Sequence, residues 1–87
     1  MKAVNNPEYE KRVIGDAVRS ILFEPNDLIT WKRFKNDIEV HKGFKVKCDK
    51  TLNTDEVIDK GNFKAIITLP SKKKVNLVLS ITTKVVI

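Results

Sequence analysis

The side chains that could catalyse a reaction or hold a metal are few in this 87-residue chain. It contains one cysteine, Cys48, and one histidine, His41, so neither an internal disulfide nor a cysteine-based zinc cluster is expected. The sequence has no serine–histidine–aspartate set, no glycine-rich phosphate loop and no metal-ligand spacing. It therefore predicts a protein that is not an enzyme and that uses no metal or cofactor.

Three carboxylates lie close together in the second half of the chain, and helix formation explains them better than catalysis. Thr54 precedes them and can cap a helix by accepting from the open N–H groups that follow it. Asp55 and Glu56 then fall in the first turn, where the helix dipole favours negative charge, and Asp59 is solvated. Gly61 stands where a left-handed residue ends a helix. A short capped helix is therefore predicted between Thr54 and Gly61.

Runs of alternating hydrophobic and polar residues flank this helix. Phe44, Val46 and Cys48 share one face of the first run, and the second extends from Phe63 to Leu69. A period of two is typical of a strand with one buried face, so Cys48 is expected to be a small buried hydrophobe. A third run, from Val75 to Ile87, follows a hairpin loop and is the most regular of the three.

The first half of the chain predicts two amphipathic helices. One begins at Asn6–Pro7 and ends before Pro25, because the residue preceding a proline is pushed away from helical geometry. The second has Thr30 as its expected cap, extends from Trp31 to about Lys42 and ends at Gly43. Its hydrophobic residues recur at spacings of three and four, which predicts one buried face.

These elements predict the α+β class: two helices and a short capped helix packed on a small, mainly antiparallel three-stranded sheet with a long C-terminal strand. Residues 1–87 would form one domain, with residues 1–5 as a flexible lead-in. Phe23 and Leu28, on either side of the turn between the helices, are expected to point into the core. The predicted core consists of Phe23, Trp31, Phe34, Val46, Phe63, Ile67, Leu77 and Leu79.

The chain carries a formal net charge of +6, and most of the excess lies in its second half. Residues 1–43 hold 8 basic and 7 acidic side chains, whereas residues 44–87 hold 9 and 4. The excess comes from Lys45, Lys47, Lys64 and the run Lys72–Lys74. A basic surface can bind nucleic acid, an anionic membrane or an acidic protein, or it can be a solvated face that protects strand edges. Aromatic residues are absent from the outward face of these strands, which disfavours single-stranded nucleic acid.

The N-terminus gives no sign of export. Lys2 is not followed by an apolar run, and no window approaches the roughly 18 apolar residues of a membrane span. With a single cysteine, the sequence favours a reducing, cytoplasmic environment and no membrane association.

Several short motifs occur in one order along the chain. They are Phe23-Glu24-Pro25-Asn26, Val46-Lys47-Cys48-Asp49, Asn53-Thr54 and Ile58-Asp59-Lys60-Gly61, followed by a closing hydrophobic hairpin. This order, over about three quarters of the chain, resembles the C-terminal domain of contractile-tail sheath proteins from myophages and related contractile injection systems. Sheath proteins are several times longer, and their connection after the second helix is often longer than the one around Gly43.

The resemblance implies a structural subunit or domain of a contractile tail sheath, located in the virion and assembled in the host cytoplasm. Its partners would be copies of itself or full-length sheath subunits, and the tail tube protein. In that family a helix of this domain contacts the tube, so Lys32, Arg33 and Lys35 are expected to face an acidic tube surface. Two alternatives remain open: a small basic nucleic-acid-binding module, and a short sheath-like protein that caps or regulates a tail. Nucleic acid is less expected as a partner than sheath subunits or the tube protein.

The last strand is longer than the strand it is expected to pair with. The run from Phe63 to Leu69 has seven residues and the run from Val75 to Ile87 has thirteen, so about six residues lack a ladder partner on that side. In the resembled family, exchanged terminal strands link the subunits. The same use is expected here, although Met1 to Val4 or the first strand could instead cover the overhang within one chain. The predicted exchange segment consists of Thr82, Thr83, Lys84, Val85, Val86 and Ile87.

Overall fold

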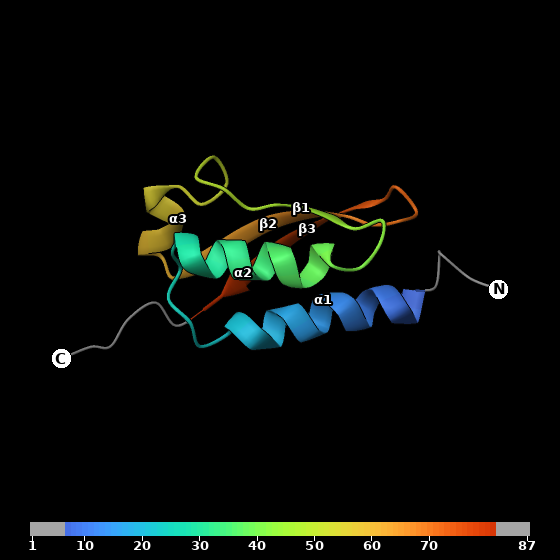
Figure 1. Cartoon of the computed structure of the whole chain (residues 1–87). Coiled ribbons are helices and arrows are strands. Elements are labelled where there is room, and N and C mark those ends of the chain that lie inside the picture. Colours follow the sequence, from blue (N-terminus) through green and yellow to red (C-terminus); the bar gives the residue numbers. More distant parts are fainter. Residues whose placement is uncertain (1–6, 82–87) are drawn as a thin grey trace.

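The computed structural model describes residues 7–81, and its three strands form one antiparallel sheet. Helices α1 and α2 lie side by side against one face of this sheet, and α3 lies at one end (Figure 1). The predicted α+β class is therefore confirmed. The elements are, in chain order, α1 (Pro7–Ile21), α2 (Leu28–Glu39), β1 (Lys45–Lys47), α3 (Asp55–Asp59), β2 (Asn62–Thr68) and β3 (Lys74–Ser80).

The strands pair in the order β1-β2-β3, which is also their order in the chain. Val46 lies opposite Ile67, and Phe63 lies opposite Leu79. Along β2, residues alternate between buried and half-buried, as the period of two predicts. The predicted continuation of the last strand to Ile87 lies outside the described residues.

Strand β1 has three residues, so it is shorter than the predicted alternating run that includes Phe44, Val46 and Cys48. Beyond the end of β1, the side chain of Asn53 forms hydrogen bonds with the backbone of β2. Its Nδ2 donates to the Lys64 carbonyl at 2.9 Å, and its Oδ1 accepts from the Lys64 N–H at 2.8 Å. The amide thus replaces a strand residue in the ladder. Thr54 follows as the cap of α3, accepting from the Val57 N–H at 3.3 Å, and this predicted cap is confirmed.

Helix α2 begins at Leu28, three residues earlier than predicted, because Asp27 is its cap. The Asp27 Oδ1 accepts from the Thr30 N–H at 3.0 Å and from the Thr30 hydroxyl at 3.1 Å. Thr30 is therefore inside the first turn, and the prediction that it caps the helix is wrong. The helix ends at Glu39, and Gly43 follows with a φ of 91°, which favours glycine.

The predicted burial of Phe23 and Leu28 is wrong: the two residues are 82% and 57% exposed. Asn26 is the buried member of this turn instead, at 7% exposed. Its Nδ2 donates to the Asn62 carbonyl, and its Oδ1 accepts from the Trp31 indole N–H. This link fills the space beneath the turn and satisfies Trp31, so both hydrophobic neighbours are left on the surface.

The remaining predicted core residues meet between α2 and the sheet. The Phe34 and Phe63 rings pack edge to face, with centroids 5.2 Å apart. Leu77 and Leu79 pack against this core but are only half-buried, because β3 is the outer strand of the described sheet. The fully or nearly fully buried members of the prediction are Trp31, Phe34, Val46, Phe63 and Ile67.

Candidate assembly surfaces

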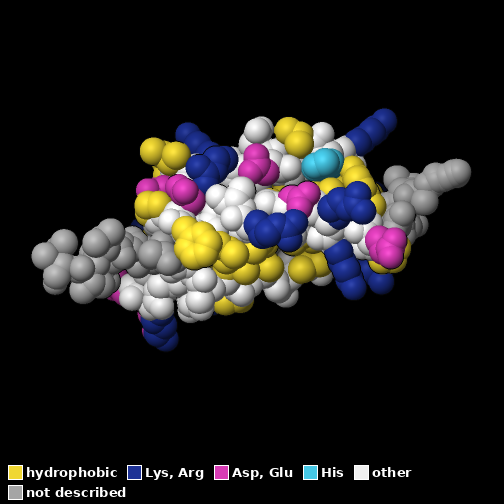
Figure 2. Space-filling view, turned by 90° about the horizontal axis from the view of Figure 1, so that it is seen from below, with side chains coloured by type: hydrophobic (Ala, Val, Ile, Leu, Met, Phe, Trp, Pro, Cys, Tyr) yellow, Lys and Arg dark blue, Asp and Glu magenta, His cyan; other side chains and the backbone are white. Residues whose placement is uncertain are grey.

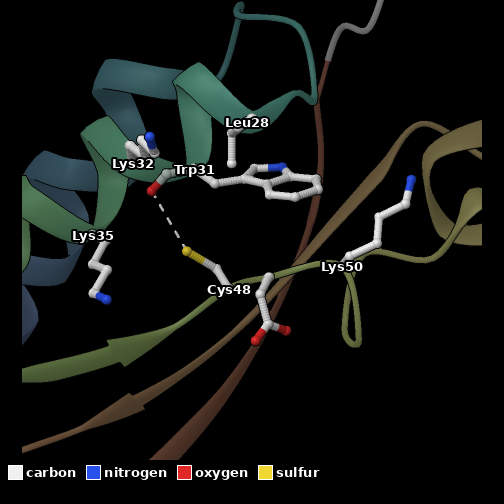
Figure 3. A pocket seen from close by; sticks show the side chains of 7 residues that line it. Leu28, Trp31, Lys32, Lys35, Cys48 and Lys50 are labelled. Carbon is white, nitrogen blue, oxygen red and sulfur yellow. Dashed lines mark hydrogen bonds between the residues drawn. The ribbon is translucent and has the colours of Figure 1, made fainter.

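Two of the three predicted tube-facing residues, Lys32 and Lys35, line one groove, which we call the Trp31 groove. It has a volume of about 370 Å³ and lies between α2 and the loop that follows β1. Figure 3 shows Trp31 lying across it, with Lys32 and Lys35 along α2 and Lys50 on the opposite loop. The floor is hydrophobic and the rim is basic. Its lining residues are Leu28, Trp31, Lys32, Lys35, Cys48, Asp49 and Lys50.

The charges around the Trp31 groove are unequally neutralised. The Lys50 ammonium lies 2.9 Å from the Asp55 carboxylate, and this hydrogen bond lowers the pKa of Asp55. Asp49 accepts from the hydroxyl and the backbone N–H of Thr51, which lowers the pKa of Asp49. Within residues 7–81, Lys32 and Lys35 form no ion pair. These two lysines are therefore the rim charges available to a partner.

Arg33 does not share this groove. Its Nη2 donates to the Ser20 carbonyl at 2.9 Å and lies 3.6 Å from the Glu24 carboxylate. Both residues belong to the end of α1 and the turn that follows it, so Arg33 binds α2 to that turn. The structure thus brings together Lys32 and Lys35 and separates Arg33 from them, because successive helical residues point about 100° apart.

Cys48 is buried, as predicted, and its thiol donates to the Trp31 carbonyl at 3.5 Å (Figure 3). Burial raises the pKa of Cys48 to about 11, against the opposing influence of the Lys35 charge. The thiolate is the reactive form, so this environment makes Cys48 a structural residue.

We expect iodoacetamide to modify Cys48 about 100-fold more slowly in the folded protein than in the unfolded chain at pH 8, because the pKa is two units higher. Mass spectrometry over time measures both rates. The pKa of Cys48 is higher in the folded state than in the unfolded state. Its contribution to the free energy of unfolding is therefore complete below about pH 9 and is lost as the pH rises through about 11. Equal rates in the two states would contradict its burial.

A second basic surface covers the face of the sheet that points away from α1 and α2. Lys45 and Lys47 alternate with the buried Val46, so they lie on this face, and the register places Lys64 and Lys74 there too. Val78, on the same face, is 59% exposed. We call this the outer lysine face. On this face Ile66 and Val78 line a pocket of about 220 Å³ together with Leu52. The strands carry no carboxylate.

A third surface runs beside β3, which pairs with β2 on one edge and, within residues 7–81, with no strand on the other. A groove of about 470 Å³ separates α1 from the β2–β3 hairpin; we call it the edge groove. Figure 2 views the molecule from below, the side of α1 in Figure 1, and shows hydrophobic side chains gathered along this face. The groove is lined by Pro7, Glu10, Lys11, Ile14, Gly15, Leu69, Lys73 and Val75. The predicted exchange segment, Thr82 to Ile87, lies outside the described residues.

Glu10 in this groove was not singled out by the sequence reasoning. It is 8% exposed, and its Oε2 is buried without a hydrogen-bond partner. A signal was available, because Glu10 belongs to the same helical stripe as Val13, Ala17 and Ile21, the buried residues of α1. A carboxylate within such a stripe marks a position that sequence analysis can flag.

The described residues give no sign of a metal centre or a membrane span. Across residues 7–81, no three histidine, cysteine, aspartate or glutamate side chains gather as metal ligands. In the same part of the chain, no helix combines the length and the hydrophobicity that crossing a bilayer requires. His41 instead lies 2.9 Å, Nδ1 to oxygen, from the Tyr9 hydroxyl and links α1 to the end of α2.

Comparison with known proteins agrees with the motif resemblance. The chain is 35% identical, over 78 aligned residues, to the tail sheath protein of Vibrio phage KVP40. The alignment covers 78% of this chain and 12% of that relative, so the chain spans about an eighth of the length of the curated protein it matches. No family model and no solved structure matches the chain. The predicted resemblance is confirmed: most of this chain is similar to one short stretch of a phage tail sheath protein.

Proposed function

We propose that the chain is a structural domain of a contractile phage tail sheath, located in the virion and assembled with copies of itself around a tail tube. The observation that carries this proposal is the 35% identity to a phage tail sheath protein over most of the chain. The fold supports it, because the three surfaces described above are a strand edge that is unpaired within residues 7–81, a lysine-rimmed groove and a basic sheet face. Each of these surfaces is suited to binding another macromolecule.

Self-assembly would use the edge of β3. We propose that Thr82 to Ile87 of one copy add to the β3 edge of the next. A free strand edge is a hazard unless it is covered, and strand addition satisfies its N–H and C=O groups. A contact of this head-to-tail kind does not close on itself and extends into filaments.

Truncation after Ile81 is expected to give a folded monomer that no longer self-associates. Ile81 is 6% exposed and its N–H donates to the Gly61 carbonyl at 2.9 Å, so the truncated chain keeps every core residue of the described part. Sedimentation velocity at high concentration measures association, and circular dichroism measures folding. Two results would contradict strand exchange: an unfolded truncated chain, or an intact chain that stays monomeric while its last six residues are protected from hydrogen exchange.

Tube binding would use Lys32, Arg33 and Lys35, as proposed from the sequence, with the Trp31 groove as its centre. Lys32 and Lys35 lack ion-pair partners within residues 7–81, so an acidic tube surface would not have to displace an existing pair. Each exposed pair is worth only about 0–1 kcal/mol, but the contact repeats along a tube.

The double variant Lys32→Glu/Lys35→Glu is expected to lose most of its co-sedimentation with assembled tail tubes, and the wild-type interaction should weaken as salt rises. Lys45→Glu/Lys47→Glu on the outer lysine face has the same charge change and is the matched control. Arg33→Glu is expected to lower stability as well, because it also breaks the contact with Ser20. Unchanged tube binding after reversal of all three charges would contradict this assignment. Steeply salt-dependent binding of the wild type to duplex DNA would favour the nucleic-acid-binding alternative.

A further inference from the structure

Glu10 is the one buried side chain within residues 7–81 that has a polar atom, Oε2, without a hydrogen-bond partner. The residue is 8% exposed and lies in the hydrophobic stripe of α1. Burying an ionised carboxylate without donors is costly, and native proteins pair such groups almost without exception. The carboxylate is therefore suited to a donor that comes from outside this part of the chain.

The surroundings of Glu10 indicate what kind of donor fits. Glu10 lines the edge groove together with Ile14 from α1 and with Leu69 and Val75 from the hairpin, so its neighbours are largely hydrophobic. Lys11 and Lys73 also line the groove, yet neither forms an ion pair with it. A ligand must therefore cover hydrophobic surface and present a hydrogen-bond donor at one position.

The place of the groove favours an extended ligand. It lies between α1 and β3, whose outer edge pairs with no strand within residues 7–81. A strand added to that edge would turn every second side chain toward α1, because side chains alternate between the two faces. Hydrophobic side chains on that face would meet Ile14 and Val75, and a cation would meet Glu10.

We propose that Glu10 selects the incoming strand by pairing with a cation on it, and that the strand is residues 82–87 of a second copy with Lys84 as the cation. This inference rests on the strand exchange proposed above. Lys84 is the one charged residue in that segment, and it stands among Thr83, Val85 and Val86. Added as an extended strand with Lys84 turned toward α1, the segment also presents Thr82 and Val86 on that face, so it offers the groove one hydrophobic side chain beside a single positive charge.

The pairing predicts that one substitution shifts two properties in opposite directions. Glu10→Gln keeps the shape of the side chain but removes a buried charge that the single copy leaves unpaired, so the melting temperature of the dilute, monomeric protein should rise. The same change removes the partner of Lys84, so self-association should weaken at least about tenfold. A glutamate that served only the fold would lower the melting temperature when replaced.

The test uses the full chain in sedimentation equilibrium, with Glu10→Gln, Lys84→Gln and the charge reversal Glu10→Lys/Lys84→Glu. Glu56→Gln, which neutralises an exposed glutamate on α3, is the control. We expect each single change at Glu10 or Lys84 to weaken association, the control to leave it unchanged, and the reversal to recover it. If both neutralised variants associate like the wild type, or if Glu10→Gln lowers the melting temperature, the pairing is wrong.

Failure of the pairing can be separated from failure of strand exchange by including the chain truncated after Ile81. If truncation abolishes association while Glu10→Gln leaves it unchanged, strand exchange stands and the role of Glu10 is overturned. If the truncated chain associates as strongly as the intact one, both proposals are overturned. If Glu10→Gln weakens association but Lys84→Gln does not, Lys84 is not the cation and the proposed pair is rejected.

Discussion

Replacing Phe34 with alanine is expected to lower the free energy of unfolding by about 3–5 kcal/mol. Phe34 is fully buried and packs edge to face on Phe63, so its removal leaves a cavity between α2 and the sheet. Small domains have about 5 kcal/mol or less from a single core, so the variant should be largely unfolded at room temperature. Urea denaturation followed by the fluorescence of Trp31, which is 6% exposed, measures the loss.

Phe23→Ala is the matched control, because it removes the same side chain from a residue that is 82% exposed. Its effect should stay within about 0.5 kcal/mol. Equal losses at Phe23 and Phe34 would mean that the turn between α1 and α2 is folded differently, with Phe23 in the core.

The second large effect is expected for Asn53→Asp, which should cost about 3–5 kcal/mol at pH 7, the range for an uncompensated buried charge. Asn53 is fully buried, and its amide both donates to and accepts from the backbone of Lys64. A carboxylate can still accept from the Lys64 N–H, but it has no donor for the Lys64 carbonyl. The variant therefore combines a buried charge with an unsatisfied carbonyl.

This loss should depend on pH in a defined direction. Burial disfavours the charged form, so the new carboxyl in Asn53→Asp has a folded-state pKa above the unfolded value of about 3.9. The variant should therefore be most stable below about pH 4 relative to the wild type and lose stability as pH rises through the folded-state pKa. Denaturation curves at several pH values measure this trend. The exposed control Asn76→Asp should show almost none of it, and a pH-independent loss at Asn53 would contradict the argument.

Sequence patterns within a few neighbouring residues predict those elements whose structure depends mainly on the same residues. The alternation from Phe63 to Leu69 predicts β2, and Thr54 and Gly61 predict both ends of α3, where the structure has a capping hydroxyl and a positive φ. Both signals act over a few residues. They need no knowledge of the rest of the chain.

The errors come from contacts between residues far apart in the sequence. The burial of Asn26 in place of Phe23 depends on a hydrogen bond to Asn62, which is 36 residues away. Without that partner, a polar side chain in a turn looks solvent-exposed and a neighbouring phenylalanine looks buried.

The same limit applies to the candidate surfaces. Lys32, Arg33 and Lys35 look equivalent in the sequence, but only Arg33 contacts a carbonyl at the end of α1 and a carboxylate in the turn that follows it. The edge groove exists only once α1 and β3 are both in place. Glu10 therefore has a detectable pattern in the sequence but no visible role until the fold is known.

The order of the strands has a consequence for how fast the domain forms. Each strand pairs with its neighbour in the chain, and α1 packs on α2, the helix that follows it. Such local contacts close short loops, and chains built from them fold faster than chains whose sheets join distant segments. During synthesis at a ribosome, each strand within residues 7–81 therefore meets its partner soon after both have emerged.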